Sequence, residues 1–229
     1  MFGNMNKSPY QAYSSAKLSP TFFGKVMMFF TFAIISSVLG IFVATIFLRE
    51  YFITMPWIMY AFFAAELILV FTSRVWSTKV PLNRFLFALF AFITGITVAP
   101  LIAIVAASTA GVAILTKALI ITAFVFTAVA ILGYTTKMDL SGMRMFLFMG
   151  LIGMIITGIV GIFLPWGNTF EMIYSGIGVL LFAGFTAYDF QKIKMYPEDR
   201  YIDAALALYL DIFNLFIYIL RLLMSLNRR

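Results

Sequence analysis

The chain has 229 residues, of which 63% are hydrophobic and only 11% are charged, and its mean hydropathy is +1.04. Soluble globular domains carry about 25% charged residues, so this composition excludes a soluble fold and indicates an integral membrane protein. Cysteine and histidine are both absent, which excludes disulfides, thiol chemistry, histidine-ligated metals and every catalytic mechanism that requires an imidazole.

Seven apolar segments follow a polar start, and each is long enough to cross a membrane as a helix, which takes about 20 residues. Residues 1–20 are rich in Ser, Tyr and Asn, and we expect a flexible cytosolic tail there. The segments cover residues 22–48, 57–76, 82–107, 112–134, 143–164, 172–193 and 204–226. We therefore predict an all-α protein in which residues 21–229 form a single domain of seven transmembrane helices.

The basic residues lie mostly between the apolar segments and predict the orientation of the chain. Of the 16 lysines and arginines, eleven fall on the side of the amino terminus when the connections are counted alternately. The positive-inside rule then places the amino terminus in the cytoplasm and the carboxyl terminus outside. The basic carboxyl end counts against this, and a re-entrant last segment would return it to the cytoplasm. We expect a plasma (bacterial inner) membrane protein whose partner is the lipid bilayer. The net charge of +7 comes from Lys and Arg residues in short loops between the spans, where they set the orientation, so we expect no nucleic-acid partner.

Three of the nine acids lie inside apolar segments, namely Glu66, Asp189 and Asp211. A carboxylate at such a position costs a few kcal/mol. Counted from the charged turn near Glu198, Asp189 lies nine residues before and Asp211 thirteen residues after. At about 1.5 Å per residue their depths differ by about 6 Å, so two antiparallel helices could bring these carboxylates together.

Further polar side chains lie near this pair in depth. Asn214 and Tyr218 share one stripe of the last segment with Asp211, at helical spacing. Arg74, in the second segment, is at a similar depth, and Glu66 is about two turns deeper on the same face. These residues could form a structural polar cluster or an ion path, and Arg74 could instead extend to lipid headgroups.

The last two segments carry motifs that resemble the Bax-inhibitor family of seven-span membrane proteins. They match the patterns A-Y-D-x-Q-x-I at residues 187–193 and L-Y-L-D-x-x-N-L-F at residues 208–216. Upstream, G-I-T-V-A-P at residues 95–100 and Y-T-T-K-M-D-L-S at residues 134–141 also match. The likeness extends in order over residues 22–226.

The resemblance implies a fold in which the last of seven helices is central and the other six wrap around it. It also implies a calcium leak channel in which two aspartates form a pH-responsive pair near an arginine of the second span. These aspartates correspond to Asp189 and Asp211, and the arginine to Arg74, with Lys79 as a second candidate.

A physical mechanism follows from two carboxylates at one depth. They cannot both ionise cheaply in a low dielectric, so they titrate as a unit. At low pH they can share a proton and hold the last two helices together, whereas at higher pH their repulsion favours an open path. Carboxylate oxygens also suit calcium, so Asp189 and Asp211 are candidate ligands for calcium as a permeant ion, in competition with protons. We expect no other cofactor and no enzymatic activity, and a role in calcium homeostasis.

Three other classes of membrane protein fit less well. An intramembrane aspartyl protease would need Gly-x-Gly-Asp, but Asp211 follows Leu208-Tyr209-Leu210. A proton-coupled secondary transporter could use either aspartate, although such proteins often contain inverted repeats and none is visible in this chain. A regulatory protein that binds other membrane proteins is the third alternative.

Overall fold

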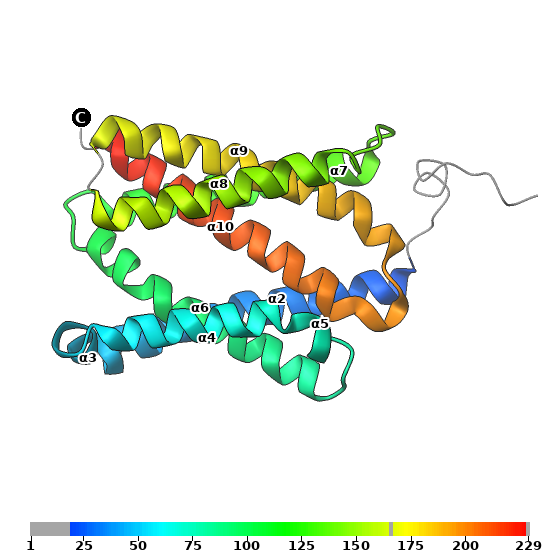
Figure 1. Ribbon diagram of the computed structural model, residues 1–229, viewed down its shortest axis with the longest axis horizontal. Coiled ribbons are helices and arrows are strands. Elements are labelled where there is room, and N and C mark those ends of the chain that lie inside the picture. The colour runs from blue at the N-terminus through cyan, green and yellow to red at the C-terminus, as the bar shows by residue number, and fades with distance from the viewer. Residues whose placement is uncertain (1–18, 165–166, 228–229) are drawn as a thin grey trace, which may run out of the picture. The chain divides into compact units, whose positions relative to one another are not determined.

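Helices form every regular element among the residues that the structure describes, which are 19–164 and 167–227 of this computed structural model. In chain order they are α2 (Pro20–Val43), the π-helix η1 (Ala44–Leu48), α3 (Arg49–Thr54), α4 (Trp57–Phe71), α5 (Ser73–Trp76), α6 (Leu82–Ala106), α7 (Gly111–Thr135), α8 (Met143–Phe163), α9 (Asn168–Lys192), the 3-10 helices η2 (Ile193–Met195) and η3 (Glu198–Arg200), and α10 (Tyr201–Asn227) (Figure 1). This architecture confirms the predicted all-α class. Nearly all of the predicted tail, residues 1–18, lies outside the described residues.

Six of these helical stretches are apolar and long enough to cross a bilayer, and they contain 19 to 35 residues each. Their outward surfaces are apolar as well, since Phe71, Phe124 and Leu180 are 74% to 80% exposed. Large hydrophobic side chains at such exposure are stable against lipid but not against water. The chain is therefore a multi-pass membrane protein.

The first two segments differ in detail from their predicted boundaries. The helix that begins at Pro20 was predicted to end at residue 48 but continues through η1 and α3 to Thr54. Charge at Arg49 and Glu50 ends the apolar run, but it does not interrupt backbone hydrogen bonding. The second segment is broken at Thr72, whose hydroxyl donates to the Ile68 carbonyl at 2.6 Å.

Because of this break, the second segment consists of α4, which has 15 residues, and the short α5. The Trp76 indole N–H donates to the Leu69 carbonyl at 3.2 Å across the break. A length of 15 residues is below the roughly 20 that a straight span requires. Among the seven apolar helices described, α4 is the shortest.

The described helices group into two compact units. The amino-terminal unit contains Ser19–Val112 and Pro197–Tyr209, and the carboxyl-terminal unit contains Ala113–Tyr196 and the chain from Leu210. The first unit thus holds α2 to α6 and the start of α10, and the second holds most of α7, α8, α9 and the rest of α10. The single domain and the central last helix stay predictions.

In the amino-terminal unit, α6 is the helix on which the others pack, and its closest partner is α2 (Figure 1). At Gly40 a Cβ atom would overlap the Phe92 carbonyl, and at Gly95 it would overlap the Ser37 carbonyl. The two backbones therefore touch, as small residues allow in membrane helices. Next to this contact Ala44, Ile96 and Ala99 form a buried apolar cluster.

In the carboxyl-terminal unit, α9 contacts α7, α8 and α10. Gly133 of α7 lies against the backbone of Ala187, and the Phe126 and Phe190 rings meet edge to face with centroids 5.6 Å apart. The Tyr218 ring of α10 lies over Gly178 and stacks on Phe182 at 5.6 Å. These contacts fix the rotation of α9.

One side chain of α9 holds the connection between α7 and α8. Gln191 is 5% exposed; its Nε2 donates to the Met138 carbonyl at 2.7 Å, and its Oε1 accepts from the Leu140 N–H at 2.9 Å. In the same connection, hydrogen bonds from the Ser141 side chain and N–H hold the pKa of Asp139 below its usual value. This loop is therefore anchored to α9 rather than free.

We predict that substituting alanine for Gly40 or Gly95 lowers the free energy of unfolding by about 1–3 kcal/mol, because the added Cβ forces α2 and α6 apart. The matched control is Gly24→Ala, at an exposed position of α2 where nothing lies within 4 Å of the added atom. That change should be neutral or stabilise by up to about 1 kcal/mol. Thermal unfolding in detergent, followed by circular dichroism, measures these effects, and equal midpoints for Gly95→Ala and Gly24→Ala would contradict the backbone contact.

We also predict that Gln191→Met releases the loop, because it removes both hydrogen bonds and leaves the Leu140 N–H without its acceptor. The expected cost is about 1–3 kcal/mol, with faster hydrogen exchange at the Leu140 amide. Lys137→Met, at an exposed position of the same loop, serves as the control and should leave that exchange rate unchanged. Unaltered exchange at Leu140 in Gln191→Met would show that the side chain does not anchor the loop.

Candidate functional site

Asp211 is the most deeply buried acid among the described residues. It lies on α10 and is 4% exposed, between the fully buried Leu208 and Leu215. Its Oδ2 atom is buried and accepts no hydrogen bond from a described residue. A buried carboxylate oxygen without a donor is costly, so this group requires a proton or a cation to balance it.

Asp189 lies on α9 and is the acid whose charge interacts with that of Asp211. Both belong to the carboxyl-terminal unit, and their carboxyl groups are close enough for their charges to interact. Asp189 is half-buried. The structure therefore brings these two acids into one site, in which ionisation of either carboxyl group affects the other.

Two cations interact favourably with Asp189, and we did not select either from the sequence. They are Lys192 and Arg144, named in the order of their effect. Lys192 follows Asp189 by three residues on the same helix, a spacing that brings side chains together and could have identified it. Its Nζ also lies 5.0 Å from the centre of the Tyr196 ring. Arg144 lies in the first turn of α8, and no local sequence pattern indicates that it is near Asp189.

The other polar residues of the α10 stripe are occupied by neighbouring groups. Asn214 Nδ2 donates to the Leu210 carbonyl of its own helix at 2.8 Å. The Tyr218 hydroxyl lies 3.5 Å from that of Tyr174, which itself donates to the Met154 carbonyl at 2.9 Å. Within this stripe the Oδ2 atom of Asp211 is thus a buried polar atom without a described partner.

The remaining two predicted site residues lie in the amino-terminal unit. Glu66 is half-buried on α4, and its Oε1 accepts from the Thr97 hydroxyl at 2.6 Å. Thr97 lies on α6 and was not selected from the sequence, since only the fold brings it beside α4. Arg74 is exposed on α5. The association of Glu66 and Arg74 with the aspartate pair stays a prediction.

The two carboxylates of the aspartate pair supply only part of the ligand shell that a resident calcium ion takes. A tightly held calcium ion takes about six to eight oxygen ligands. Within the described residues, no cluster of three or more His, Cys, Asp or Glu side chains could hold a metal. Two carboxylates can attract and briefly coordinate a hard cation, and they leave most of its ligands to water or backbone carbonyls.

Comparison with known proteins places the chain in a family. A family model described as inhibitor of apoptosis-promoting Bax1 matches residues 19–228. The chain is 30% identical over 215 residues to a protein of Campylobacter jejuni, an alignment that covers 94% of this chain and 92% of that protein.

Two named relatives agree with this match. The inner membrane protein YbhL of Escherichia coli K12 is 34% identical over 172 residues, which are 68% of this chain and 69% of that protein. A BI1-like protein of Arabidopsis thaliana is 37% identical over 160 residues, which are 68% of this chain and 60% of that protein. The family match covers both aspartate motifs and confirms the resemblance that they carry. The chain belongs to the Bax-inhibitor family and is an all-α, multi-pass membrane protein.

Proposed function

We propose that this protein is a pH-sensitive cation leak channel that conducts calcium and is gated by protonation of the Asp189 and Asp211 pair. The observation that carries the proposal is the burial of Asp211, whose Oδ2 atom has no described partner, within electrostatic range of Asp189. A structural cluster would be expected to pair its buried oxygens. A carboxyl group that exchanges protons or cations needs an oxygen that can bind them without first breaking a hydrogen bond to another side chain.

The gate works through the charge of the pair. When the two acids share one proton, the site carries a single negative charge and α9 and α10 stay together. When both ionise, their negative charges repel, and any two unit charges about 4 Å apart at an effective dielectric constant of about 20 repel by about 4 kcal/mol. That repulsion is large compared with RT and favours an arrangement in which the helices separate and water enters.

The two acids have different charged neighbours, so we assign them different roles in the gate. Burial disfavours the ionised form of Asp189, and Lys192 and Arg144 partly offset this effect, so Asp189 ionises more readily than a buried acid that has no such cations. Asp211 is buried, lies between the buried Leu208 and Leu215 along α10, and has Asp189 as its charged neighbour. In this proposal Asp211 is therefore the member that binds and releases the gating proton.

Calcium competes with that proton for the same oxygens. Hard cations prefer carboxylate and carbonyl ligands, and a pair with two negative charges attracts a divalent ion more strongly than a pair with one. Calcium passage is therefore favoured by the same rise in pH that opens the gate. The name of the Escherichia coli relative, an inner membrane protein, supports placement in the plasma membrane of a bacterium. The distribution of Lys and Arg between the apolar segments supports an amino terminus in the cytoplasm.

We predict that calcium flux into proteoliposomes rises with pH for the parent protein and loses this response in Asp189→Asn and Asp211→Asn. Asparagine cannot ionise, so each variant lacks the repulsion at every pH. Flux at about pH 8 should fall about tenfold, the change that about 1.4 kcal/mol of lost opening free energy produces. Asp199→Asn, at an exposed acid outside the pair, is the control and should behave like the parent. A parent-like pH profile in both variants would refute the gate.

The same vesicles distinguish a channel from a coupled transporter. For a leak channel we expect calcium entry that follows the calcium gradient and persists when an ionophore collapses the proton gradient. Calcium entry that stops without a proton gradient, or that moves protons in fixed proportion, would contradict the channel and support coupled transport.

A further inference from the structure

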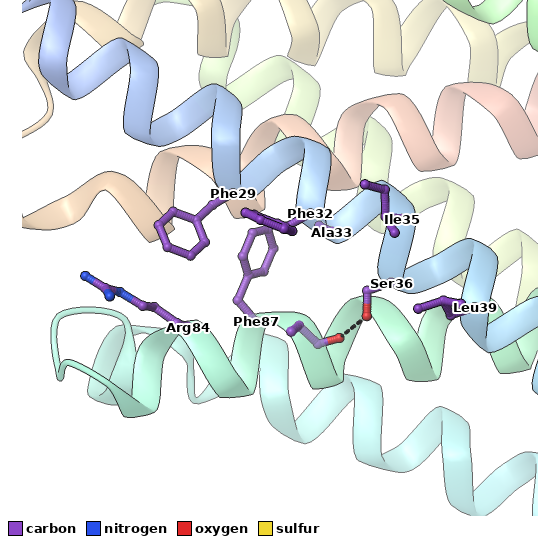
Figure 2. Close-up of a pocket in the computed structure, with 9 residues that line it drawn as sticks. Phe29, Phe32, Ala33, Ile35, Ser36, Leu39, Arg84 and Phe87 are labelled. Atoms are coloured by element: carbon purple, nitrogen blue, oxygen red, sulfur yellow. Dashed lines mark hydrogen bonds between the residues drawn. The ribbon is translucent and has the colours of Figure 1, made fainter.

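A groove lies between α2 and α6 of the amino-terminal unit. The residues that line it are distant in sequence from both aspartates. It has a volume of about 280 Å³, and its walls include Phe29, Phe32 and Leu39 of α2 and Arg84, Phe87 and Ala88 of α6. Figure 2 shows the aromatic rings along one stretch of the groove and the Arg84 guanidinium at its end. The groove is apolar along its length and cationic at one end.

The length of the groove corresponds to one leaflet of a bilayer. It extends along α2 from Phe29 to Leu39, which is about 15 Å at 1.5 Å per residue, half of a hydrocarbon core of about 30 Å. Its floor stays open because the small Ser36 and Ala88 meet there, where the Ser36 hydroxyl donates to the Ala88 carbonyl at 2.8 Å (Figure 2). An extended acyl chain fits these dimensions and this apolar lining.

Two cations lie at the end of the groove where α6 begins. The Arg84 guanidinium carbon lies 5.6 Å from the centre of the Phe29 ring, and its Nε–H donates to the Tyr201 hydroxyl at 3.3 Å. Lys25 Nζ lies 6.0 Å from the centre of the same Tyr201 ring. Tyr201 therefore lies between Lys25 and Arg84 and holds both charges at the head of the groove.

Neither cation is neutralised within the part of the chain that the structure describes. The ion pair recorded for the described residues joins Arg200 to Asp203 at 3.2 Å, so the nearby acid Asp203 is already engaged. The Arg84 bond to Tyr201 uses Nε, whereas bidentate recognition of a phosphate can use the terminal guanidinium nitrogens. The charge at this end thus complements an anion that lies at the membrane surface.

We propose that this groove binds one phospholipid with an anionic headgroup, its acyl chain along α2 and α6 and its phosphate on Arg84, assisted by Lys25. The groove is a membrane-facing slot whose charged end lies at the start of α6, and a lipid supplies both the chain and the anion that the two parts require. This binding is independent of the aspartate pair and goes beyond the proposed channel function.

The test titrates purified, delipidated full-length protein with phosphatidylglycerol or with phosphatidylcholine of identical acyl chains, and native mass spectrometry counts the bound lipids. For the parent we expect one saturable phosphatidylglycerol that binds more tightly than phosphatidylcholine. Arg84→Gln should weaken phosphatidylglycerol binding about fivefold, the effect of about 1 kcal/mol per basic residue at a membrane surface, and weaken phosphatidylcholine binding less, because the choline charge already offsets the phosphate. Ala88→Leu should fill the groove and weaken both lipids at least about tenfold.

Lys137→Gln is the charge-matched control, at an exposed loop position outside the groove, and should bind both lipids like the parent. Thermal midpoints close to that of the parent show that the variants are folded, and Ala88 is exposed, so leucine should be tolerated there. Equal affinity of the parent for the two lipids, or unchanged binding in both groove variants, would overturn the proposal. So would a parent dimer that Ala88→Leu converts to monomer, since the groove would then be an interface between two copies.

Discussion

The structure depends on how a hydrocarbon environment treats polar groups. Backbone N–H and C=O groups find no water there, so every segment that crosses must satisfy them internally, and helices do this. The same environment makes a carboxylate such as Asp211 costly at any position inside an apolar helix. Most side chains of the protein are therefore hydrophobic because the lipid environment requires it. The few that do not, Asp189, Asp211 and Glu66, are where chemistry can be expected.

The treatment of these acids differs between the two units. Glu66 has one strong hydrogen bond, from Thr97 at 2.6 Å, and a hydroxyl donor of this kind can satisfy a carboxylate or a carboxylic acid. Asp189 has two cations within electrostatic range. Asp211 has an unsatisfied oxygen and a like charge nearby. From Glu66 to Asp189 to Asp211, the carboxylate is stabilised less and less by neighbouring hydrogen-bond donors and cations. Protonation therefore relieves the largest unfavourable free energy at Asp211.

Much of the fold could be predicted from the sequence because long apolar runs admit few alternatives to helices. The boundaries that were wrong share one cause: hydropathy reports where lipid can surround a segment, not where hydrogen bonding stops, so the extension to Thr54 and the break at Thr72 were missed. The two aspartates could be selected because their distance from one turn sets their depth. Arg144 and Thr97 could not, since each depends on which helices become neighbours. Lys192 could have been found, because it lies one helical turn after Asp189.

The hydrogen bonds of Gln191 attach the largely exposed loop at residues 136–142 to α9. Gln191 is two residues from Asp189 on α9, and it grips the loop backbone at both Met138 and Leu140. A soluble partner that pulled this loop from α9 would strain the turn of helix that carries Asp189. Since coupling between two binding events is reciprocal, the charge state of that aspartate would also set how firmly such a partner holds. The two Gln191 hydrogen bonds therefore connect this loop to the helical turn that carries Asp189.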